Sequence, residues 1–226
     1  MIHLNVYTSL IASIIIQLIT GIIEIFTLFI PVKSSFLFLK QLVLLEFFVQ
    51  IIELSFYIYW LYNFNHIFNI TPKRYIDWAI TTPTMLVNLI FYLIFLQYKQ
   101  NNISDQLHFF TLFRQQFYTI ITILLLNSIM LLFGYLAEIH VLPLFLAVFL
   151  GFIPFLIYYY IIYTKYAILT NDGYQIFFYF FIFWSLYGIA ALLPYKIKNI
   201  SYNILDLFSK NFFSIFLAYI IFTNKY

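Results

Sequence analysis

The chain of 226 residues is 65% hydrophobic and only 8% charged. A soluble domain has about 25% charged residues, so this chain cannot cover a water-soluble surface and must have a lipid bilayer as its main solvent. The formal net charge of +3 is too small to indicate a nucleic-acid partner, and the lack of cysteine excludes disulfides and thiolate metal sites.

Apolar runs predict seven transmembrane helices, and because each span needs about 20 residues they fill one domain, residues 1–226. In chain order the predicted helices are residues 5–30, 36–62, 73–98, 115–136, 142–166, 174–193 and 202–223. Residues 100–114 are polar and then mixed, which predicts either a short amphipathic helix on the membrane surface or a plain loop. Lys and Arg are more frequent in the loops that lie on the same side of the membrane as the C-terminus. This bias favours a cytoplasmic C-terminus and an extracellular N-terminus.

A few ionisable residues fall inside these spans, where each costs about 2.5–3.5 kcal/mol on insertion scales. They are Glu24, Glu46, Glu53, Arg74, Asp77, Asp206 and Lys210. Glu24 lies near a helix end, so an interfacial and an interior position are equally open for it. Asp206 and Lys210 lie in mid-span, four residues apart and therefore on one helix face. This spacing predicts either a local ion pair or a lysine that forms a Schiff base beside a carboxylate counter-ion.

Three motifs surround these charges and the sixth span: Arg-Tyr-Ile-Asp-Trp-Ala-Ile-Thr-Thr-Pro at 74–83, Trp-Ser-Leu-Tyr at 184–187 and Asp-Leu-Phe-Ser-Lys at 206–210. Together they resemble the motifs of microbial rhodopsins. They fall on the third, sixth and seventh spans, as in that family, although Gly188 stands where the family usually has proline. The resemblance covers essentially the whole chain and implies an all-α bundle of seven transmembrane helices.

The resemblance also implies a chromophore site. All-trans retinal would be bound covalently to Lys210 as a Schiff base, with Asp77 and Asp206 as counter-ions and Arg74 holding their water network. The pocket walls that it implies are Trp78, Thr81, Thr82, Trp184 and Tyr187.

The sequence motifs indicate the family more clearly than they indicate the kind of activity. Asp77 occupies the acceptor position of an outward proton pump, but Asn88 stands where a pump has its donor carboxylate. A carboxamide cannot supply a proton, which weakens the pump interpretation without excluding it. A sensory photoreceptor would need a transducer-binding surface or an added domain. An enzyme is not favoured, because the sequence offers no metal-ligand cluster or nucleophile–base set and its four histidines fall in or near loops.

Polar residues form stripes with helical spacing on four of the spans. The stripes are Ser9, Ser13, Gln17, Thr20 and Glu24; Glu46, Gln50 and Glu53; Arg74, Asp77, Thr81, Thr84 and Asn88; and Asn199, Asn203, Asp206, Lys210 and Ser214. If these helices are neighbours, they share one polar seam of the kind that a cation pathway requires. The alternative is hydrogen bonding between helices, which we favour for the first span alone. Two glutamates in one span are costly for that purpose and favour function.

Within microbial rhodopsins, the chain most resembles the group from giant algal viruses that works as light-gated cation channels. The matching residues are Glu46 and Glu53, Asn211 directly after the retinal lysine, the Lys198-Asn199 pair, Asn203, and a first-span serine that is either Ser9 or Ser13. The resemblance implies a pathway for small monovalent cations, to which we also assign Asn88. It implies a host-cell membrane as the location, and it leaves open whether the protein is a homo-oligomer.

In this interpretation, two sets of residues close the pathway in the dark. Arg74, Asp77, Asp206 and Lys210 would close its outer and central parts. Glu46, Glu53 and Asn211 would form a hydrogen-bonded gate on the cytoplasmic side.

Overall fold

The computed structural model describes residues 5–224, and this part of the chain holds seven helices that are long and apolar enough to cross a membrane. The first six are α1 (Val6–Phe29), α2 (Leu37–Tyr62), α3 (Thr71–Gln100), α5 (Phe117–Glu138), α6 (Leu144–Lys165) and α7 (Asn171–Ala191). The seventh span consists of α8 (Tyr195–Asp206), a π-helical segment (Leu207–Asn211) and α9 (Phe212–Thr223). The seven-helix, all-α prediction is therefore confirmed.

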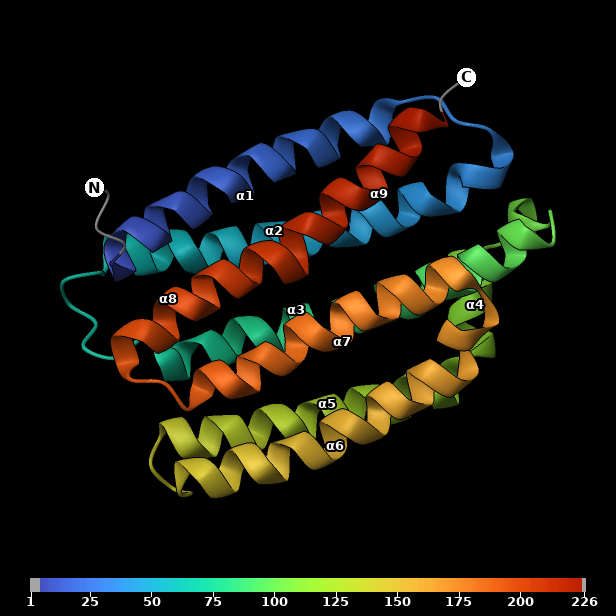
Figure 1. The fold of residues 1–226 in the computed structure, drawn as a ribbon. Helices are drawn as coiled ribbons and strands as arrows, with labels where there is room; N and C mark the ends of the chain where they lie inside the picture. Colours follow the sequence, from blue (N-terminus) through green and yellow to red (C-terminus); the bar gives the residue numbers. More distant parts are fainter. Residues whose placement is uncertain (1–4, 225–226) are drawn as a thin grey trace.

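The helices form a closed bundle in chain order (Figure 1). Each span packs against the next, and α1 closes the ring against α8 and α9. α3 is the most buried span and α5 the least. The two termini lie at opposite ends of the bundle, as an odd number of spans requires. We refer to these ends as the N-terminal end and the C-terminal end.

Helix boundaries follow local capping chemistry. α1 begins at a capping box, in which Asn5 Oδ1 accepts from the Thr8 amide and Thr8 Oγ1 accepts from the Asn5 amide. α7 begins three residues before its predicted start, because Thr170 Oγ1 caps it by accepting from the Gly173 amide at 3.0 Å. α6 continues through Pro154 as a single helix.

Two regions differ from the prediction more clearly. The seventh span starts at Tyr195 rather than at residue 202, because its first two turns are polar and carry no apolar signal. The connection at residues 100–114 contains a 3₁₀ turn (Ser104–Gln106) and the short helix α4 (Phe109–Gln115). On α4, Leu112 is buried and Phe110 is exposed, so the helical alternative is the correct one.

Candidate functional site

The centre of the bundle holds a lysine surrounded by three carboxylates. Lys210 is 2% exposed, and its Nζ lies 3.0 Å from Asp77 Oδ2, 3.5 Å from Glu53 Oε1 and 3.6 Å from Asp206 Oδ1. The carboxylates come from α3, α2 and α8, so the cluster joins three helices. The sequence predicted Asp77 and Asp206 beside the lysine, whereas Glu53 was expected at a separate gate.

Lys210 lies in the π-helical segment, which the sequence did not predict. A π turn adds a residue to the helical repeat and is common at functional sites. α7 supports this turn from outside, because Tyr179 Oη donates to the Phe208 carbonyl oxygen at 2.7 Å. The segment that carries Lys210 is therefore held in place by a hydrogen bond from α7.

Asp206 is the most strongly hydrogen-bonded of the three carboxylates. Tyr57 Oη donates to its Oδ2 at 2.6 Å, and Tyr187 Oη donates to its Oδ1 at 2.7 Å. Arg74 Nη1 lies 3.4 Å from Oδ2. All of these partners except Tyr187 are almost fully buried. Asp206 is thus stabilised as an anion by a cation and two phenols.

The charges of this cluster do not balance. Lys210 and Arg74 supply two positive charges, whereas Glu53, Asp77 and Asp206 would supply three negative ones. An uncompensated charge in the interior is costly, so one carboxyl is expected to hold a proton. Among the described residues, the contact of 3.5 Å with Lys210 Nζ is the one polar contact of Glu53, which makes Glu53 the carboxyl best suited to be neutral.

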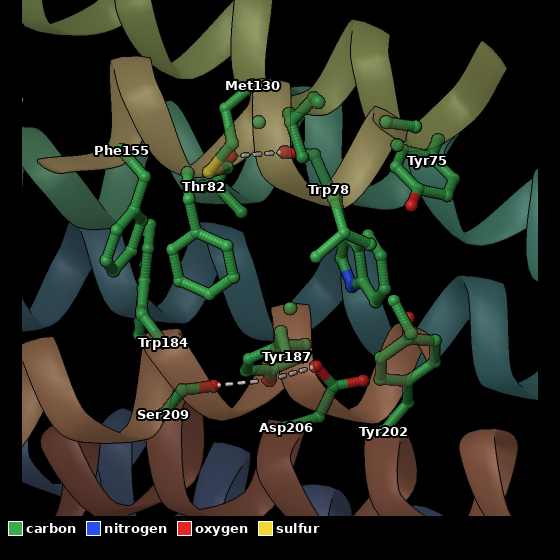
Figure 2. A pocket seen from close by; sticks show the side chains of 18 of the residues that line it. Tyr75, Trp78, Thr82, Met130, Phe155, Trp184, Tyr187, Tyr202, Asp206 and Ser209 are labelled. Atoms are coloured by element: carbon green, nitrogen blue, oxygen red, sulfur yellow. Dashed lines mark hydrogen bonds between the residues drawn. The ribbon is translucent and has the colours of Figure 1, made fainter. Parts of the chain in front are cut away.

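Beside the lysine lies a mostly apolar cavity with about 800 Å³ of empty space, part of it open to the surface. Its wall at the lysine includes Trp78, Trp184 and Tyr187, and Figure 2 shows Tyr187 between Ser209 and Asp206. The opposite wall, from α5 and α6, consists of Met130, Leu131, Gly134, Ala147, Val148, Gly151, Phe152 and Phe155. The cavity is therefore mostly apolar, and its polar groups, including the Lys210 amine and Asp206, gather at one wall.

Four of the five predicted pocket residues, Trp78, Thr82, Trp184 and Tyr187, line this cavity. Thr81 does not belong to the lining, and its Oγ1 donates to the Asp77 carbonyl oxygen at 3.0 Å. Successive helical residues are turned by about 100°, which takes Thr81 away from the cavity that Thr82 faces.

The departure at Gly188 has a packing explanation. A Cβ atom at this position would lie 2.6 Å from Phe152 Cε2, so the Phe152 ring occupies the space of a side chain.

Polar side chains fill the seam between α1, α2, α3 and α8 toward the N-terminal end. Asn203 Nδ2 donates to Ser9 Oγ at 2.9 Å, and Ser13 Oγ donates to the Asn203 carbonyl oxygen at 3.3 Å. Arg74 donates to Asn203 Oδ1 and, through Nε at 3.1 Å, to Asn199 Oδ1. The predicted stripes of these helices therefore meet, with Arg74 at their centre.

Lys198 was predicted to belong to the cation pathway, but its side chain points to α5. Its Nζ donates to Glu138 Oε1 of α5 at 2.7 Å, and both side chains are largely buried. The structure thus assigns Lys198 to an ion pair with α5 rather than to the seam. Glu138 gave no sequence signal, because it follows the predicted end of its helix.

Toward the C-terminal end, the seam contains two separate hydrogen-bonded pairs. Asn88 Nδ2 donates to Glu46 Oε1 at 2.6 Å, and Asn211 Nδ2 donates to Gln50 Oε1 at 2.9 Å. Both pairs are buried. Glu46, Asn211 and Glu53 therefore do not form one gate, because Glu53 lies with Lys210, two turns along α2 from Glu46.

Glu24 is fully buried, which settles its position in favour of the interior. The polar groups that interact with it are Ser214 and Glu46. Several polar atoms of this half have no hydrogen-bond partner within the described residues, namely those of Gln17, Thr20 and Glu24 on α1. Such atoms are normally satisfied by water, so this half of the seam is suited to hydration.

Comparison with known proteins gives a consistent result. A family model described as bacteriorhodopsin-like protein matches residues 6–224. The crystal structure of viral rhodopsin OLPVRII is similar with a TM-score of 0.81 and 28% identity, covering 96% of this chain and 98% of that one. No curated protein matches significantly.

More distant structures share the fold alone. A blue light-absorbing proteorhodopsin from Med12 has a TM-score of 0.72 and 19% identity, covering 96% of both chains. Bromide-bound halorhodopsin from Halobacterium salinarum has a TM-score of 0.73 and 14% identity, covering 96% of this chain and 93% of that one.

Proposed function

The chain belongs to the bacteriorhodopsin-like family, and from that membership we propose that it binds retinal through Lys210 Nζ and works as a light-gated channel for small monovalent cations. The family implies retinal bound to a lysine. Lys210 is the buried lysine that lines the cavity, whereas Lys198 is engaged with Glu138.

The residues of the cavity fit this group. Retinal is an apolar polyene with one aldehyde, and the cavity offers an apolar lining that ends on an amine. Trp78 and Trp184 would hold the polyene, and Asp77 and Asp206 would balance the charge on Nζ. When bound, retinal supplies a change of shape driven by visible light.

The observation that carries the channel proposal is the polar seam. It contains residues from four neighbouring helices and continues from Ser9 near the N-terminal end, past Lys210, to Glu24 near the C-terminal end. Buried charged groups are expensive in a membrane, and where they occur they commonly mark an ion or proton pathway. Carboxylates and amides along such a seam can replace the water of a passing cation.

Lys210 would close the seam in the dark at its middle. Its Nζ holds Glu53, Asp77 and Asp206 from three helices, and Arg74 continues the closure toward the N-terminal end. A movement of Nζ away from Asp77 would release α3 from this shared cation. Water and cations could then enter between Arg74 and the carboxylates.

Voltage clamp of cells that express the protein with retinal tests this function. We expect a light-evoked current that reverses near the equilibrium potential of the permeant cation and follows it when the ions on one side are changed. A current that stays outward at all voltages, and persists without a gradient, would reject the channel.

A second candidate is a light-driven outward proton pump. The contact of 3.0 Å between Asp77 and Lys210 Nζ favours it, since a pump needs a nearby acceptor carboxylate. The pump predicts light-driven acidification of the medium that persists without a gradient and is lost in Asp77→Asn.

A further inference from the structure

The half of the seam toward the C-terminal end is built in two layers, one helical turn apart. In the first layer, a Cβ atom on Gly21 would lie 3.6 Å from Gln50 Cγ, and Asn211 Nδ2 donates to Gln50 Oε1 at 2.9 Å. α1 and the seventh span run toward the C-terminal end from this layer, and α2 comes from that end. The second layer lies one turn, or about 5 Å, nearer to the C-terminal end, and its members are Glu24, Glu46 and Ser214.

The contacts of the second layer agree with this depth. Ser214 and Glu46 both interact with Glu24. Asn88 of α3 joins them, because its Nδ2 donates to Glu46 Oε1 at 2.6 Å and to the Leu42 carbonyl oxygen at 3.0 Å. Four helices thus each contribute one side chain, and all four residues are between 0% and 2% exposed. We call this set the oxygen layer: Glu24, Glu46, Asn88 and Ser214.

The buried side-chain atoms of the oxygen layer that have no hydrogen-bond partner within residues 5–224 are all oxygens. They are Glu24 Oε1 and Oε2, Glu46 Oε2 and Asn88 Oδ1. The first layer differs, because Gln50 Nε2, a donor, is among its unpartnered atoms. Water satisfies a mixture of donors and acceptors, whereas oxygens from carboxylates, a carboxamide and a hydroxyl suit a hard cation.

The charges of the oxygen layer also favour a cation. None of the ion pairs within the described residues includes Glu24 or Glu46, and Lys210 already contacts three other carboxylates. A buried carboxylate without a cation is costly. One monovalent cation would balance one carboxylate while the other carboxyl keeps its proton. A divalent cation would need both carboxyls ionised and would lose much more hydration energy in so buried a place.

We propose that the oxygen layer binds a small monovalent cation such as Na⁺ at rest, without light and without retinal. Glu24 and Glu46 would balance its charge, and Asn88 Oδ1 and Ser214 Oγ would replace part of its water shell. The inference rests on the proposed cation pathway for its role, in which the bound ion, already partly dehydrated, is the one that moves when the seam opens. The binding itself can be measured in the dark.

Thermal unfolding of the purified protein in NaCl and in N-methyl-D-glucamine chloride of equal ionic strength tests the site. Sodium should raise the midpoint in a saturable way, by about 5 °C at 100 times its Kd, because it binds only the folded chain. In Glu24→Gln the sodium concentration for half of this effect should rise at least tenfold. This variant should still fold, since it removes a buried carboxyl and keeps the shape of the side chain.

Two further variants separate the site from its surroundings. Asn88→Asp adds a third carboxyl to the oxygen layer and should lower the sodium concentration for half of the effect severalfold, because affinity rises with the number of charged ligands. Asp105→Asn changes an exposed carboxylate outside the spans, and it should leave that concentration unchanged within about twofold.

Equal midpoints in the two salts, the same sodium dependence in Glu24→Gln and in the native protein, or a rise with CaCl₂ but not with NaCl would each overturn the assignment. The proposed function would fail in a different way. If sodium stabilises the protein through Glu24 while voltage clamp shows no light-evoked current that follows the cation gradient, the binding site stands and the channel is rejected.

Discussion

At the residue scale, the cluster around Lys210 assigns different charges to three carboxylates. Asp206 has a cation and two phenol donors, Asp77 has the closest contact with Nζ, and Glu53 has only its longer contact with Nζ among the described residues. Substituting an ionised carboxylate should change the charge beside the chromophore, whereas substituting a neutral one should not.

This difference predicts the colours of two variants. With retinal bound, Asp77→Asn should shift the absorption maximum to longer wavelength by tens of nanometres, on the order of 2 kcal/mol of lost electrostatic stabilisation of the charge on Nζ. Glu53→Gln should shift it much less. Absorption spectra of the purified variants measure both shifts. A red shift in Glu53→Gln as large as that in Asp77→Asn would show that Glu53 is ionised and that the proton is held elsewhere.

Gly188 allows a second prediction at this scale. Gly188→Ala places a Cβ atom 2.6 Å from Phe152, so one of the two must move, and overpacking of this kind costs about 1–3 kcal/mol. We expect a lower midpoint for thermal bleaching of the retinal-bound protein. Phe152→Leu should restore most of the loss in the double variant. An unchanged midpoint in Gly188→Ala would mean that the Phe152 ring moves freely.

Single residues also mark the limit of what sequence can predict. Lys210, Asp77 and Asp206 were identified by motif, and the structure brings both carboxylates within 3.6 Å of Lys210 Nζ. The place of Glu53 beside Lys210 was not predicted, because helical spacing gives the face of a residue but not the depth at which two helices meet. The pairing of Lys198 with Glu138 was missed for the same reason, because it depends on the depth at which α8 meets α5.

At the element scale, hydropathy predicted that all seven spans exist. It did not predict where the seventh span begins or that a π-helical segment interrupts it. The first turn of this span is exposed, and the polar residues that follow, Lys198 and Asn199, are buried against α5 and α3. Its π-helical segment depends on the contacts that its neighbours make, which a single sequence does not contain.

The support of this segment by α7 can be tested. Tyr179→Phe removes the donor to the Phe208 carbonyl oxygen, and a hydrogen bond between membrane helices contributes about 0.6 kcal/mol on average. We expect a small decrease in thermal stability together with faster amide exchange around Leu207–Asn211. Tyr118→Phe, at an exposed tyrosine of α5, is the matched control. Equal exchange in both variants would contradict a supporting role.

At the scale of the whole molecule, α3 separates two kinds of interior. On one side, α3 joins α1, α2, α8 and α9 around the polar seam, and on the other it joins α5, α6 and α7 around the apolar cavity. The sequence predicted the seam from its stripes, but the cavity depends on small residues such as Gly134 and Ala147, which have no pattern of their own.

The Lys198–Glu138 pair connects these two halves at one end of the bundle. Glu138→Ala would leave the ammonium of Lys198 buried without its partner, which should cost about 3 kcal/mol. Replacing both residues, as in Lys198→Met with Glu138→Leu, should recover most of that loss. Thermal unfolding of the two single variants and the double variant measures the coupling. Additive effects would show that the ion pair contributes nothing to joining α5 and α8.

The position of α3 between seam and cavity has a consequence for how such a protein can diversify. A substitution at a buried residue of α3 can alter both interiors, so the seam and the cavity cannot be changed independently there. The walls from α5 and α6 touch only the cavity. In the retinal-bound channel proposed above, substitutions that change colour should therefore accumulate on those two helices, whereas substitutions that change ion selectivity should fall on α1 and α2.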